Sequence, residues 1–571
     1  MKVADYLVEC LIRNGVTDVF GLPGEVVLEF LDALDKRKSD INAHVCYHEQ
    51  AGALEACGYA QASGKLGVAY ATKGPGIMNM VSAIQDAYYD STPMAIITAH
   101  ESAPYNGSMR FKDNQELDTA SLFSSMTKCV ARIDNLETAA DDIEAAITLA
   151  QSDRPGPVLL DFSGKLLSSE IPAPRCNAEN TRGSQESSDC HAIAEHILSE
   201  FHSSKRPVIL FGAGILLSKT QKLAHLLLER LNVPALTSRC SQDVIGGSKL
   251  NFGYIGSHAT RYSNTILRKC DLIISLGNRM AFNPESATFG EIVKNTRIIR
   301  VDVDENEFTR FFPKAMHYKA NLSDLMPLLA ESAEPDDKHR DWLSACESVR
   351  EILGDYDTDH PVRALSAIIQ NATTGTVFTS DVGNNEFWLS RAYTLTNASN
   401  RILYSKSFGL LGCSLPKAIG AQIASGSRVI CFTGDQGFQM NIQELQFIAA
   451  RNLPILIVVV NNNSSGMILC RQRKRKSTHF LHTTAEGGYS PPPFKNIAKA
   501  YGIGYNKESC DNITKIGELV KSLALPCILE LTVPETADIS PYIPFGNHCD
   551  DFVPPTKDED KKRIEKILHE I

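Results

Sequence analysis

The sequence lacks long apolar runs, paired cysteine motifs and an excess of basic charge. Its longest apolar run, LPILIVVV, is far too short to cross a membrane and fits a strand buried on both faces. The 15 cysteines are scattered without a CxxC pair, and the amphipathic N-terminus does not resemble a signal peptide. The net charge of −10 argues against nucleic-acid binding. The basic run RQRKRK at 471–476 stands out against this acidic background. These absences predict a cytoplasmic protein that binds neither membranes nor nucleic acid.

Short β-rich runs such as RVICFTGD and PILIVVVNN alternate with helical stretches along the whole chain. This alternation predicts an α/β fold with three doubly wound parallel-sheet domains. Polar or charged stretches separate the domains and read as linkers. The expected organisation is an N-terminal domain at 1–165, a linker at 166–190, a central domain at 191–332, a linker at 333–359, a C-terminal domain at 360–545 and a charged tail at 546–571.

An acidic residue and an asparagine follow two neighbouring buried runs. Asp435 comes after RVICFTG and Asn462 after PILIVVVN, 27 positions later (435 to 462), with the helical stretch NIQELQFIAAR between them. Adjacent parallel strands would bring both to the ligand-binding edge of a sheet. Carboxylate, amide and carbonyl oxygens suit Mg²⁺, and Gly434 and Gly437 would let the backbone approach a diphosphate. The alternative is a helix-capping aspartate beside an ordinary asparagine turn.

The stretch GDQGFQMNIQELQFIAARNLPILIVVVNNNSSGM resembles the thiamin-diphosphate motif, a GD(G) turn followed by NN. The resemblance implies that Mg²⁺ binds Asp435, Asn462 and the backbone carbonyl of Ser464. Gln436 departs from the motif, because the family often has glycine or alanine there. The cofactor contacts implied by this stretch are Gly434, Asp435, Gln436, Gly437, Asn462, Gly466 and Met467.

A second motif lies far away, in the first domain. VCYHEQAGALEACGYAQASGK resembles the family stretch HEQ…GYARASGK, which places at Glu49 the glutamate that hydrogen-bonds the aminopyrimidine ring. Such a glutamate needs partial burial and a raised pKa; a solvated surface carboxylate is the alternative. FGLPGE, with Glu25 for the last glycine, and TKGPGIMN resemble cofactor turns and imply contacts from Gly24, Pro75 and Asn79.

Three further stretches resemble acetolactate synthases or related enzymes. NQELDTASLFSSMTK places Gln115 beside the reaction intermediate and Lys128 near the substrate. SDVGNNEFW resembles a turn that touches the diphosphate and would do so through Asn384 and Asn385. FGLLGCSLPKAIGA places Leu411 where the family has the large apolar residue that bends the cofactor.

Taken together, these motifs identify the chain as a member of the thiamin-diphosphate-dependent superfamily, similar to the large catalytic subunit of acetolactate synthase. The resemblance implies a pyrimidine-binding first domain, a diphosphate-binding third domain, and a homodimer or dimer of dimers. Glu49 would then meet Asp435 of a partner chain. FGYIGSHATRYSN and LGNRMAFN partly resemble flavin-binding stretches, with Ala259 replacing a glycine. Arg279 is therefore a candidate FAD contact; a central domain without flavin is the alternative.

The implied reaction is Mg²⁺-dependent decarboxylation of a 2-oxo acid, with pyruvate as the expected donor, and carboligation of the resulting enamine to an acceptor carbonyl. Gln115 favours carboligation, and there is no HH doublet typical of simple decarboxylases, only the lone His100. Arg471 stands where acetolactate synthases have a tryptophan. It predicts a larger anionic acceptor, such as a nucleotide-linked keto sugar; a solvated basic face is the alternative. A non-ligating decarboxylase and a catalytically idle homologue also stay open.

Overall fold

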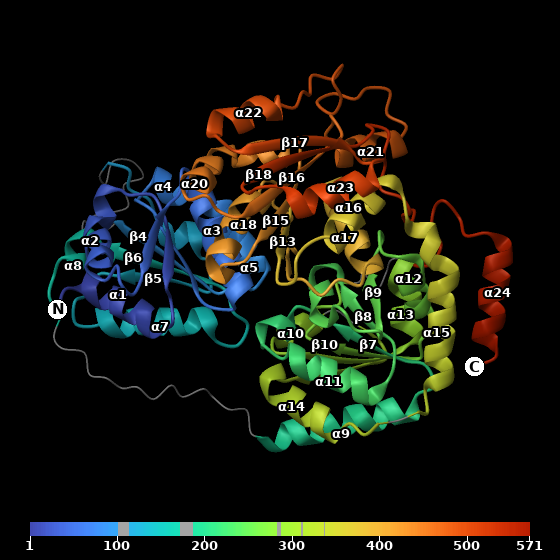
Figure 1. The fold of residues 1–571 in the computed structure, drawn as a ribbon. Helices are drawn as coiled ribbons and strands as arrows, with labels where there is room; N and C mark the ends of the chain where they lie inside the picture. The colour runs from blue at the N-terminus through green and yellow to red at the C-terminus, as the bar shows by residue number, and fades with distance from the viewer. Residues whose placement is uncertain (101–113, 172–186, 282–286, 310–311, 336) are drawn as a thin grey trace.

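The structure, a computed structural model, describes residues 1–100, 114–171, 187–281, 287–309, 312–335 and 337–571. Three six-stranded sheets, each flanked by helices, make up the chain (Figure 1). Every strand pair within the described sheets is parallel, which confirms the predicted α/β class. One sheet lies inside each predicted domain range. The domain limits themselves stay a prediction, and residues 172–186 of the predicted first linker lie outside the described part.

The first sheet has the order β2-β1-β3-β4-β6-β5. Its strands are β1 (Asp18–Gly21), β2 (Asn42–Val45), β3 (Gly67–Tyr70), β4 (Met94–His100), β5 (Cys129–Ile133) and β6 (Pro157–Ser163). Its helices are α1 (Val3–Arg13), the 3₁₀ turn η1 (Glu25–Val27), α2 (Leu28–Lys36), α3 (Glu49–Ser63), α4 (Pro75–Asn79), α5 (Val81–Tyr89), α6 (Thr119–Phe123), α7 (Ala139–Gln151) and α8 (Gly164–Leu167).

The third sheet, β14-β13-β15-β16-β18-β17, repeats the strand order of the first. Its strands are β13 (Val377–Ser380), β14 (Ile402–Leu403), β15 (Val429–Gly434), β16 (Ile455–Asn461), β17 (Gly504–Ser509) and β18 (Cys527–Thr532). Its helices are α16 (His360–Gln370), α17 (Asn384–Leu395), α18 (Ser414–Ser425), α19 (Gly437–Met440), η5 (Ile442–Glu444), α20 (Leu445–Ala450), α21 (Gly466–Lys474), α22 (Phe494–Tyr501) and α23 (Ile513–Ser522). No repeat was visible in the residues, so this likeness lies in the topology alone.

The central sheet has the order β12-β11-β10-β7-β8-β9, the arrangement typical of dinucleotide-binding folds. Its strands are β7 (Pro207–Phe211), β8 (Ala235–Ser238), β9 (Asn251–Ile255), β10 (Leu272–Leu276), β11 (Arg297–Asp302) and β12 (Ala315–Lys319). Its helices are α9 (Ser187–Ser203), α10 (Gly214–Leu217), α11 (Gln221–Leu231), η2 (Arg239–Ile245), α12 (Arg261–Lys269), α13 (Ala287–Asn295), η3 (Glu305–Thr309) and α14 (Leu322–Ser332). Further along the chain come α15 (Arg340–Leu353), η4 (Gly354–Asp357) and the C-terminal α24 (Asp558–His569).

The first and third domains meet through α3 and α18, which lie side by side in the middle of the molecule (Figure 1). Small residues allow the two backbones to approach closely. A Cβ added to Gly420 would lie 1.8 Å from the carbonyl oxygen of Glu55, and one added to Gly58 would lie 2.3 Å from that of Lys417. This contact fixes the two sheets relative to each other and therefore positions the site described below.

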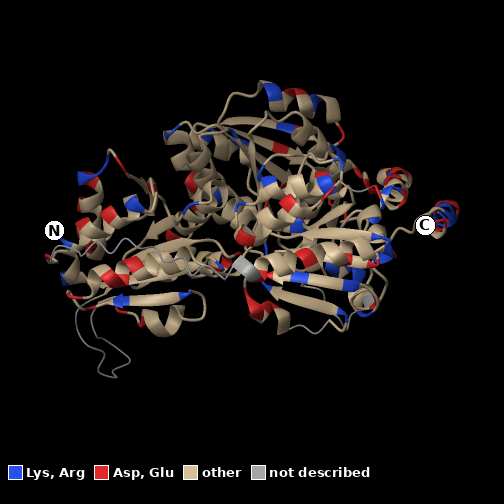
Figure 2. Cartoon of the chain, turned by 90° about the horizontal axis from the view of Figure 1, so that it is seen from below, with Lys and Arg blue, Asp and Glu red and all other residues tan. Residues whose placement is uncertain are grey.

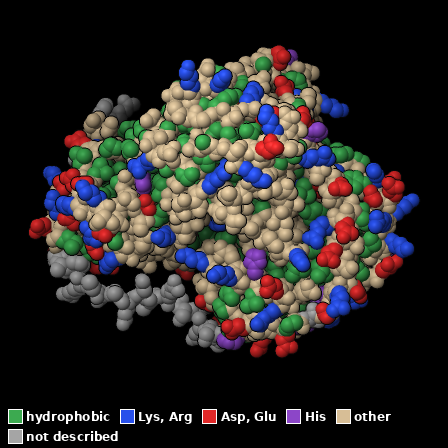
Figure 3. Space-filling model, in the orientation of Figure 1, with side chains coloured by type: hydrophobic (Ala, Val, Ile, Leu, Met, Phe, Trp, Pro, Cys, Tyr) green, Lys and Arg blue, Asp and Glu red, His purple; other side chains and the backbone are tan. Residues whose placement is uncertain are grey.

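The surface is charged but mixed in sign. On the face in Figure 3, basic and acidic side chains are interspersed, and in Figure 2 helix α24 at the rim carries both signs. No helix among the described residues is long and apolar enough to span a membrane. The cysteines that the structure describes are all free thiols, most of them buried.

Candidate functional site

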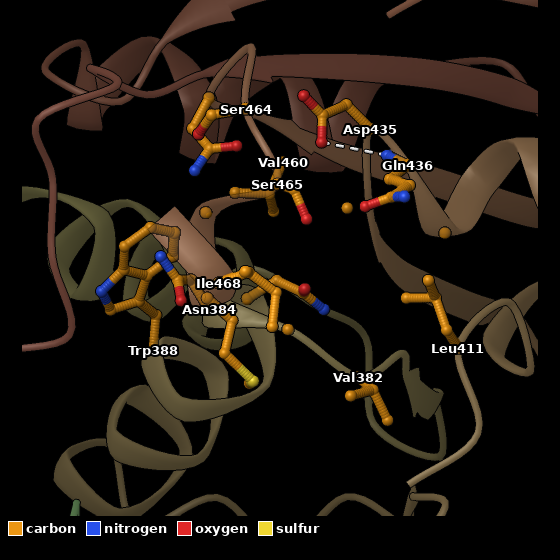
Figure 4. Close-up of a pocket in the computed structure, with 17 residues that line it drawn as sticks. Val382, Asn384, Trp388, Leu411, Asp435, Gln436, Val460, Ser464, Ser465 and Ile468 are labelled. Carbon is orange, nitrogen blue, oxygen red and sulfur yellow. Dashed lines mark hydrogen bonds between the residues drawn. The ribbon is translucent and has the colours of Figure 1, made fainter. Parts of the chain in front are cut away.

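A cavity opens at the carboxyl ends of β13, β15 and β16 (Figure 4). It encloses about 660 Å³ of empty space, part of it open to solvent. The chain order reverses between β13 and β15, so the cavity sits where open parallel sheets usually bind ligands. The lining includes these residues predicted from sequence: Asn384, Asn385, Leu411, Gly434, Asp435, Gln436, Gly437, Asn462, Ser464, Gly466 and Met467.

Strand register brings the two halves of the predicted metal clamp together. β15 and β16 pair so that Gly434 is opposite Val460, and Asp435 and Asn462 follow these positions. The Asp435 side chain is buried, and its Oδ1 accepts the backbone N–H of Gln436 at 2.9 Å (Figure 4). Burial raises the pKa of this carboxyl to about 6.

Several buried polar atoms around the cavity have no hydrogen-bond partner among the described residues. They include Oδ2 of Asp435, both amide atoms of Asn384 and the hydroxyl of Ser464. Buried polar atoms are normally paired, so an unpaired group facing a cavity indicates a ligand. The oxygen atoms among them lie beside the N-terminus of α17 and fit a Mg²⁺ ion, and the amide nitrogen of Asn384 fits a hydrogen bond to a diphosphate.

Glycines allow the close approach of backbone that this site requires. A Cβ on Gly466 would lie 2.3 Å from the amide nitrogen of Asn462, and one on Gly437 would lie 2.2 Å from Oδ2 of Asp381. Gln436, which the motif does not predict, lines the cavity beside Asp435 without disturbing the strand register. The departure from the family therefore changes the cavity wall and leaves the clamp geometry in place.

The neighbouring asparagines have structural partners. The amide of Asn461 donates to Oε1 of Glu530 at 2.9 Å, and its Oδ1 accepts the N–H of Asn463 at 3.0 Å. Asn463 itself has a left-handed backbone, with φ of 52°, which asparagine tolerates. Of the three asparagines, only Asn462 lines the cavity.

A second cluster forms at the carboxyl edge of the first sheet. Glu49 begins α3, is half-buried, and its Oε2 accepts the amide of Asn79 at 2.9 Å. Pro75 starts α4, which Asn79 ends. Gln115, with φ of 60°, packs its carbonyl against Gly74, next to Pro75. Gly24 approaches Thr72 so closely that a Cβ there would lie 2.4 Å from Cβ of Thr72.

Glu49 does not line the cavity, although the neighbouring Gln50 accepts a hydrogen bond from Asn441 of the third domain at 3.3 Å. The cavity lining comes wholly from residues 382–468 in the part of the chain that the structure describes. The predicted proton-handling carboxylate and the predicted diphosphate clamp thus lie on different domains.

Comparison with known proteins identifies the family to which the chain belongs. Family models of the thiamine pyrophosphate enzymes match in sequence order: the N-terminal TPP binding domain over residues 1–122, the central domain over 194–329 and the C-terminal TPP binding domain over 381–525. A probable acetolactate synthase large subunit from Methanococcus aeolicus is 30% identical, with 99% of this chain and 97% of the relative covered. The chain belongs to the thiamine pyrophosphate enzyme family.

Other relatives agree with this assignment. Acetolactate synthase isozyme 2 large subunit from Escherichia coli K12 is 29% identical, with 96% of this chain and 98% of the relative covered. Acetolactate synthase 1, chloroplastic, from Oryza sativa subsp. japonica is 30% identical, covering 97% and 88%. The family predicted from the sequence motifs is confirmed, and the chain is an enzyme similar to acetolactate synthases.

Three of the residues predicted for this thiamine pyrophosphate enzyme belong neither to the cavity lining nor to the Glu49 cluster. Lys128 donates to the carbonyls of Leu149 and Ser152 at 2.6 and 2.9 Å and so caps the end of α7. Its ammonium group thus has partners within the fold, and a substrate role for Lys128 stays a prediction. Arg471, on α21, is exposed, and its guanidinium has no hydrogen bond or ion pair with any described residue.

The third residue, Arg279, belongs to the FAD prediction. Its Nε pairs with Oε1 of Glu307 at 2.8 Å. The glycine-rich turn after β7 is filled by backbone, since a Cβ on Gly212 would lie 2.1 Å from the carbonyl oxygen of Gly277. These contacts do not decide whether FAD binds, so FAD stays a prediction. No step below depends on FAD.

Sequence reasoning missed several residues of the site. Asp381 accepts the N–H groups of Val382 and Gly412, both at 2.8 Å, and burial raises its pKa to about 6. Its position directly after β13, as the second residue of the predicted SDVG turn, was the available signal. Trp388 and Ile468 line the cavity but carry no chemical signature in the sequence.

Proposed function

We propose that the protein decarboxylates a 2-oxo acid, with pyruvate as the expected donor, and joins the two-carbon fragment to an acceptor carbonyl. Thiamin diphosphate and Mg²⁺ are the proposed cofactors. The observation that carries the proposal is the buried carboxylate of Asp435, which lines a cavity at adjacent strand ends and whose Oδ2 has no well-formed hydrogen bond, although the hydroxyl of Tyr489 lies near it. Similarity to acetolactate synthases over nearly the whole chain supports ligation over simple decarboxylation.

When bound, thiamin diphosphate supplies a carbon nucleophile and an electron sink for the loss of CO₂. Asp435, Asn462 and the carbonyl of Ser464 would hold Mg²⁺ against the diphosphate. Leu411, which lies below Asp435 and Gln436 in Figure 4, would support the cofactor between its two rings. Glu49 would hold a proton against the aminopyrimidine nitrogen, and Gln115 would orient the acceptor.

The proposed enzyme is a homodimer, or a dimer of dimers, with its sites at the subunit interface. One chain supplies the cavity and the partner supplies Glu49. The surfaces beside both clusters carry exposed apolar side chains: Tyr47 and Met78 near Glu49, and Met440 three residues after Gly437, are 45%, 41% and 50% exposed. Exposed apolar groups beside an incomplete site favour contact with a second copy.

Arg471 supports an anionic acceptor as a second, finer proposal. It follows Met467, which lines the cavity, by one helical turn, and such residues share a helix face. By contrast, Arg473 on the same helix pairs with Glu535 at 3.2 Å. A free guanidinium next to the cavity fits a phosphate or carboxylate on the acceptor, as in a nucleotide-linked keto sugar.

The test is to incubate the protein with carbon-labelled pyruvate, thiamin diphosphate, Mg²⁺ and a panel of neutral and anionic carbonyl acceptors. We expect labelled CO₂ together with a product whose mass is the acceptor plus a two-carbon unit. Free aldehyde in stoichiometry with CO₂, with no condensation product, would instead establish a simple decarboxylase. The Glu49→Gln variant is the control: it should bind cofactor and turn over at least about 100-fold more slowly.

A further inference from the structure

The loop that carries Leu411 is anchored by another domain. Residues 404–412 run from β14 to α18 in the third domain. The helix beneath the loop is α5 of the first domain, which ends at Tyr89 and is followed by Asp90. Two carboxylates from this helix end, Asp86 and Asp90, make the contacts.

Asp90 holds two consecutive backbone groups of the loop. Its Oδ2 accepts the N–H of Lys406 at 2.8 Å and its Oδ1 accepts the N–H of Ser407 at 3.0 Å. Next to it, the ring of Tyr89 stacks on that of Phe408, with centroids 5.7 Å apart. Charge-assisted hydrogen bonds to both oxygens of Asp90 hold the backbone of Lys406 and Ser407 against α5.

Asp86 holds the loop through two further groups. Its Oδ1 accepts the hydroxyl of Ser405 at 2.5 Å, and the same hydroxyl oxygen accepts the N–H of Leu410 at 2.8 Å. Its Oδ2 pairs with Nζ of Lys417 at 2.8 Å, and neither side chain is exposed to solvent. The hydroxyl of Ser405 thus connects Asp86 to Leu410, the residue that precedes Leu411.

The far end of the loop is fixed within the third domain. The N–H of Gly412 donates to Asp381, and its carbonyl accepts the amide of Asn441 at 2.9 Å. Gly412 has φ of 84°, a conformation that other residues rarely adopt. The side chain of Leu411 is therefore held between two anchors, and the one before it comes from the first domain.

We propose that Asp86 and Asp90 are positioning residues, which set the place of Leu411 in the cavity and thereby the bent shape of the bound cofactor. The inference rests on the proposed function, because only that function gives Leu411 a role. It assigns to the junction between domains a part in cofactor activation, in addition to its part in the fold.

The test uses Asp90→Asn and Ser405→Ala. Asparagine has the shape of aspartate but turns an NH₂ group toward one of the two N–H groups, and alanine removes the bridge from Asp86 to Leu410. Asp86 itself is left unchanged, because its loss would strand the buried ammonium of Lys417. Asp18→Asn is the matched control, since Asp18 is a buried carboxylate of the first domain that bonds His44 at 2.8 Å and not the loop.

Three quantities are measured on the Mg²⁺-loaded full-length protein: the melting temperature, the dissociation constant of thiamin diphosphate, and the rate of deuterium exchange at the thiazolium C2 position. Cavity-lining Trp388 offers a fluorescence signal for binding. We expect both loop variants to slow exchange by about 10- to 100-fold, with affinity changed less than about threefold. Leu411→Ala should behave in the same way.

Asp18→Asn should lower the melting temperature and leave exchange unchanged. Exchange at the wild-type rate in Asp90→Asn, or a loss of exchange that only follows weaker binding, would overturn the positioning role while leaving the proposed function intact. If the wild-type protein itself does not accelerate exchange, the proposed function is wrong and this inference is wrong with it.

Discussion

Asp435 is the residue on which the cofactor site depends. Its carboxylate is buried and its Oδ2 has no well-formed hydrogen bond, an arrangement that costs free energy in the absence of a cation. We expect Asp435→Asn to weaken Mg²⁺-dependent binding of thiamin diphosphate by at least about 100-fold, while the cofactor-free protein keeps or raises its melting temperature. Calorimetric titration and thermal melting measure both. Exposed Asn463 is the control, and Asn463→Gly, which keeps the left-handed backbone, should bind normally. Tight binding by the aspartate variant would remove Asp435 from the clamp.

His258 makes stability depend on pH. Burial and nearby cations lower its pKa from 6.5 to about 3. The charged groups around it are Lys474, Arg391, Arg239 and Arg471, and Glu386 pairs with Arg239 at 3.0 Å. Between about pH 6.5 and pH 3 the unfolded chain binds a proton that the folded protein does not. This residue therefore destabilises the fold as pH falls through that window, by up to about 1.4 kcal/mol per pH unit.

The urea midpoint at pH 7, 6 and 5 measures this dependence. The His258→Gln variant should lose less stability between pH 7 and pH 5 than the wild type does. Exposed His479 provides the control, and His479→Gln should follow the wild-type curve. Parallel curves for the wild type and His258→Gln would show that the imidazole titrates normally in the fold.

Arg471 separates the two acceptor classes. Arg471→Gln should raise KM for anionic acceptors by about 10- to 100-fold, because a charge-assisted contact is lost, and should leave CO₂ release from the donor unchanged. Arg475→Gln, at the exposed end of the same helix, is the matched control. Steady-state kinetics with one anionic and one neutral acceptor give the comparison. Equal effects on both acceptors would favour a solvated basic face.

At the scale of elements, the α3–α18 contact depends on glycine. Alanine at Gly420 would clash with the carbonyl of Glu55 in a helix that cannot move away without displacing a whole domain. Gly420→Ala should lower the free energy of unfolding by about 1–3 kcal/mol, measured by urea titration. Gly354, with ordinary helical angles and open space around it, is the control, and Gly354→Ala should be neutral or slightly stabilising. Equal stability of the two variants would contradict close helix packing.

Helices, strands and motifs were predictable from the sequence where neighbouring residues determine them. Buried runs ending in Asp435 and in the asparagine triplet predicted two adjacent strand ends, and the register of β15 and β16 confirms this. Contacts between distant residues were not predictable. Glu307 lies 28 positions from Arg279, and the carbonyl of Leu149 lies 21 from Lys128. The residues next to Arg279 and Lys128 therefore do not predict these contacts. The shared strand order of the first and third sheets leaves no trace in residue identities.

At the scale of the whole molecule, the C-terminal residues pack against the central domain. Ile564 and Leu568 of α24 are buried in the cluster that contains Trp342 of α15. Arg261 of α12 donates to the carbonyl of Pro554 at 2.7 Å. The predicted charged tail thus ends in an amphipathic helix packed against the central domain, at the right of Figure 1.

The central claim is that Glu49 of one chain completes the Asp435 site of another. Mixing Glu49→Gln with Asp435→Asn tests it most directly, once native mass spectrometry has verified subunit exchange. Each mixed dimer would hold one intact site, formed by the Asp435 of the first variant and the Glu49 of the second. Half of the randomly paired dimers are mixed and each has one site of two, so about a quarter of wild-type activity should return. A fully exchanged mixture without activity would contradict the shared site.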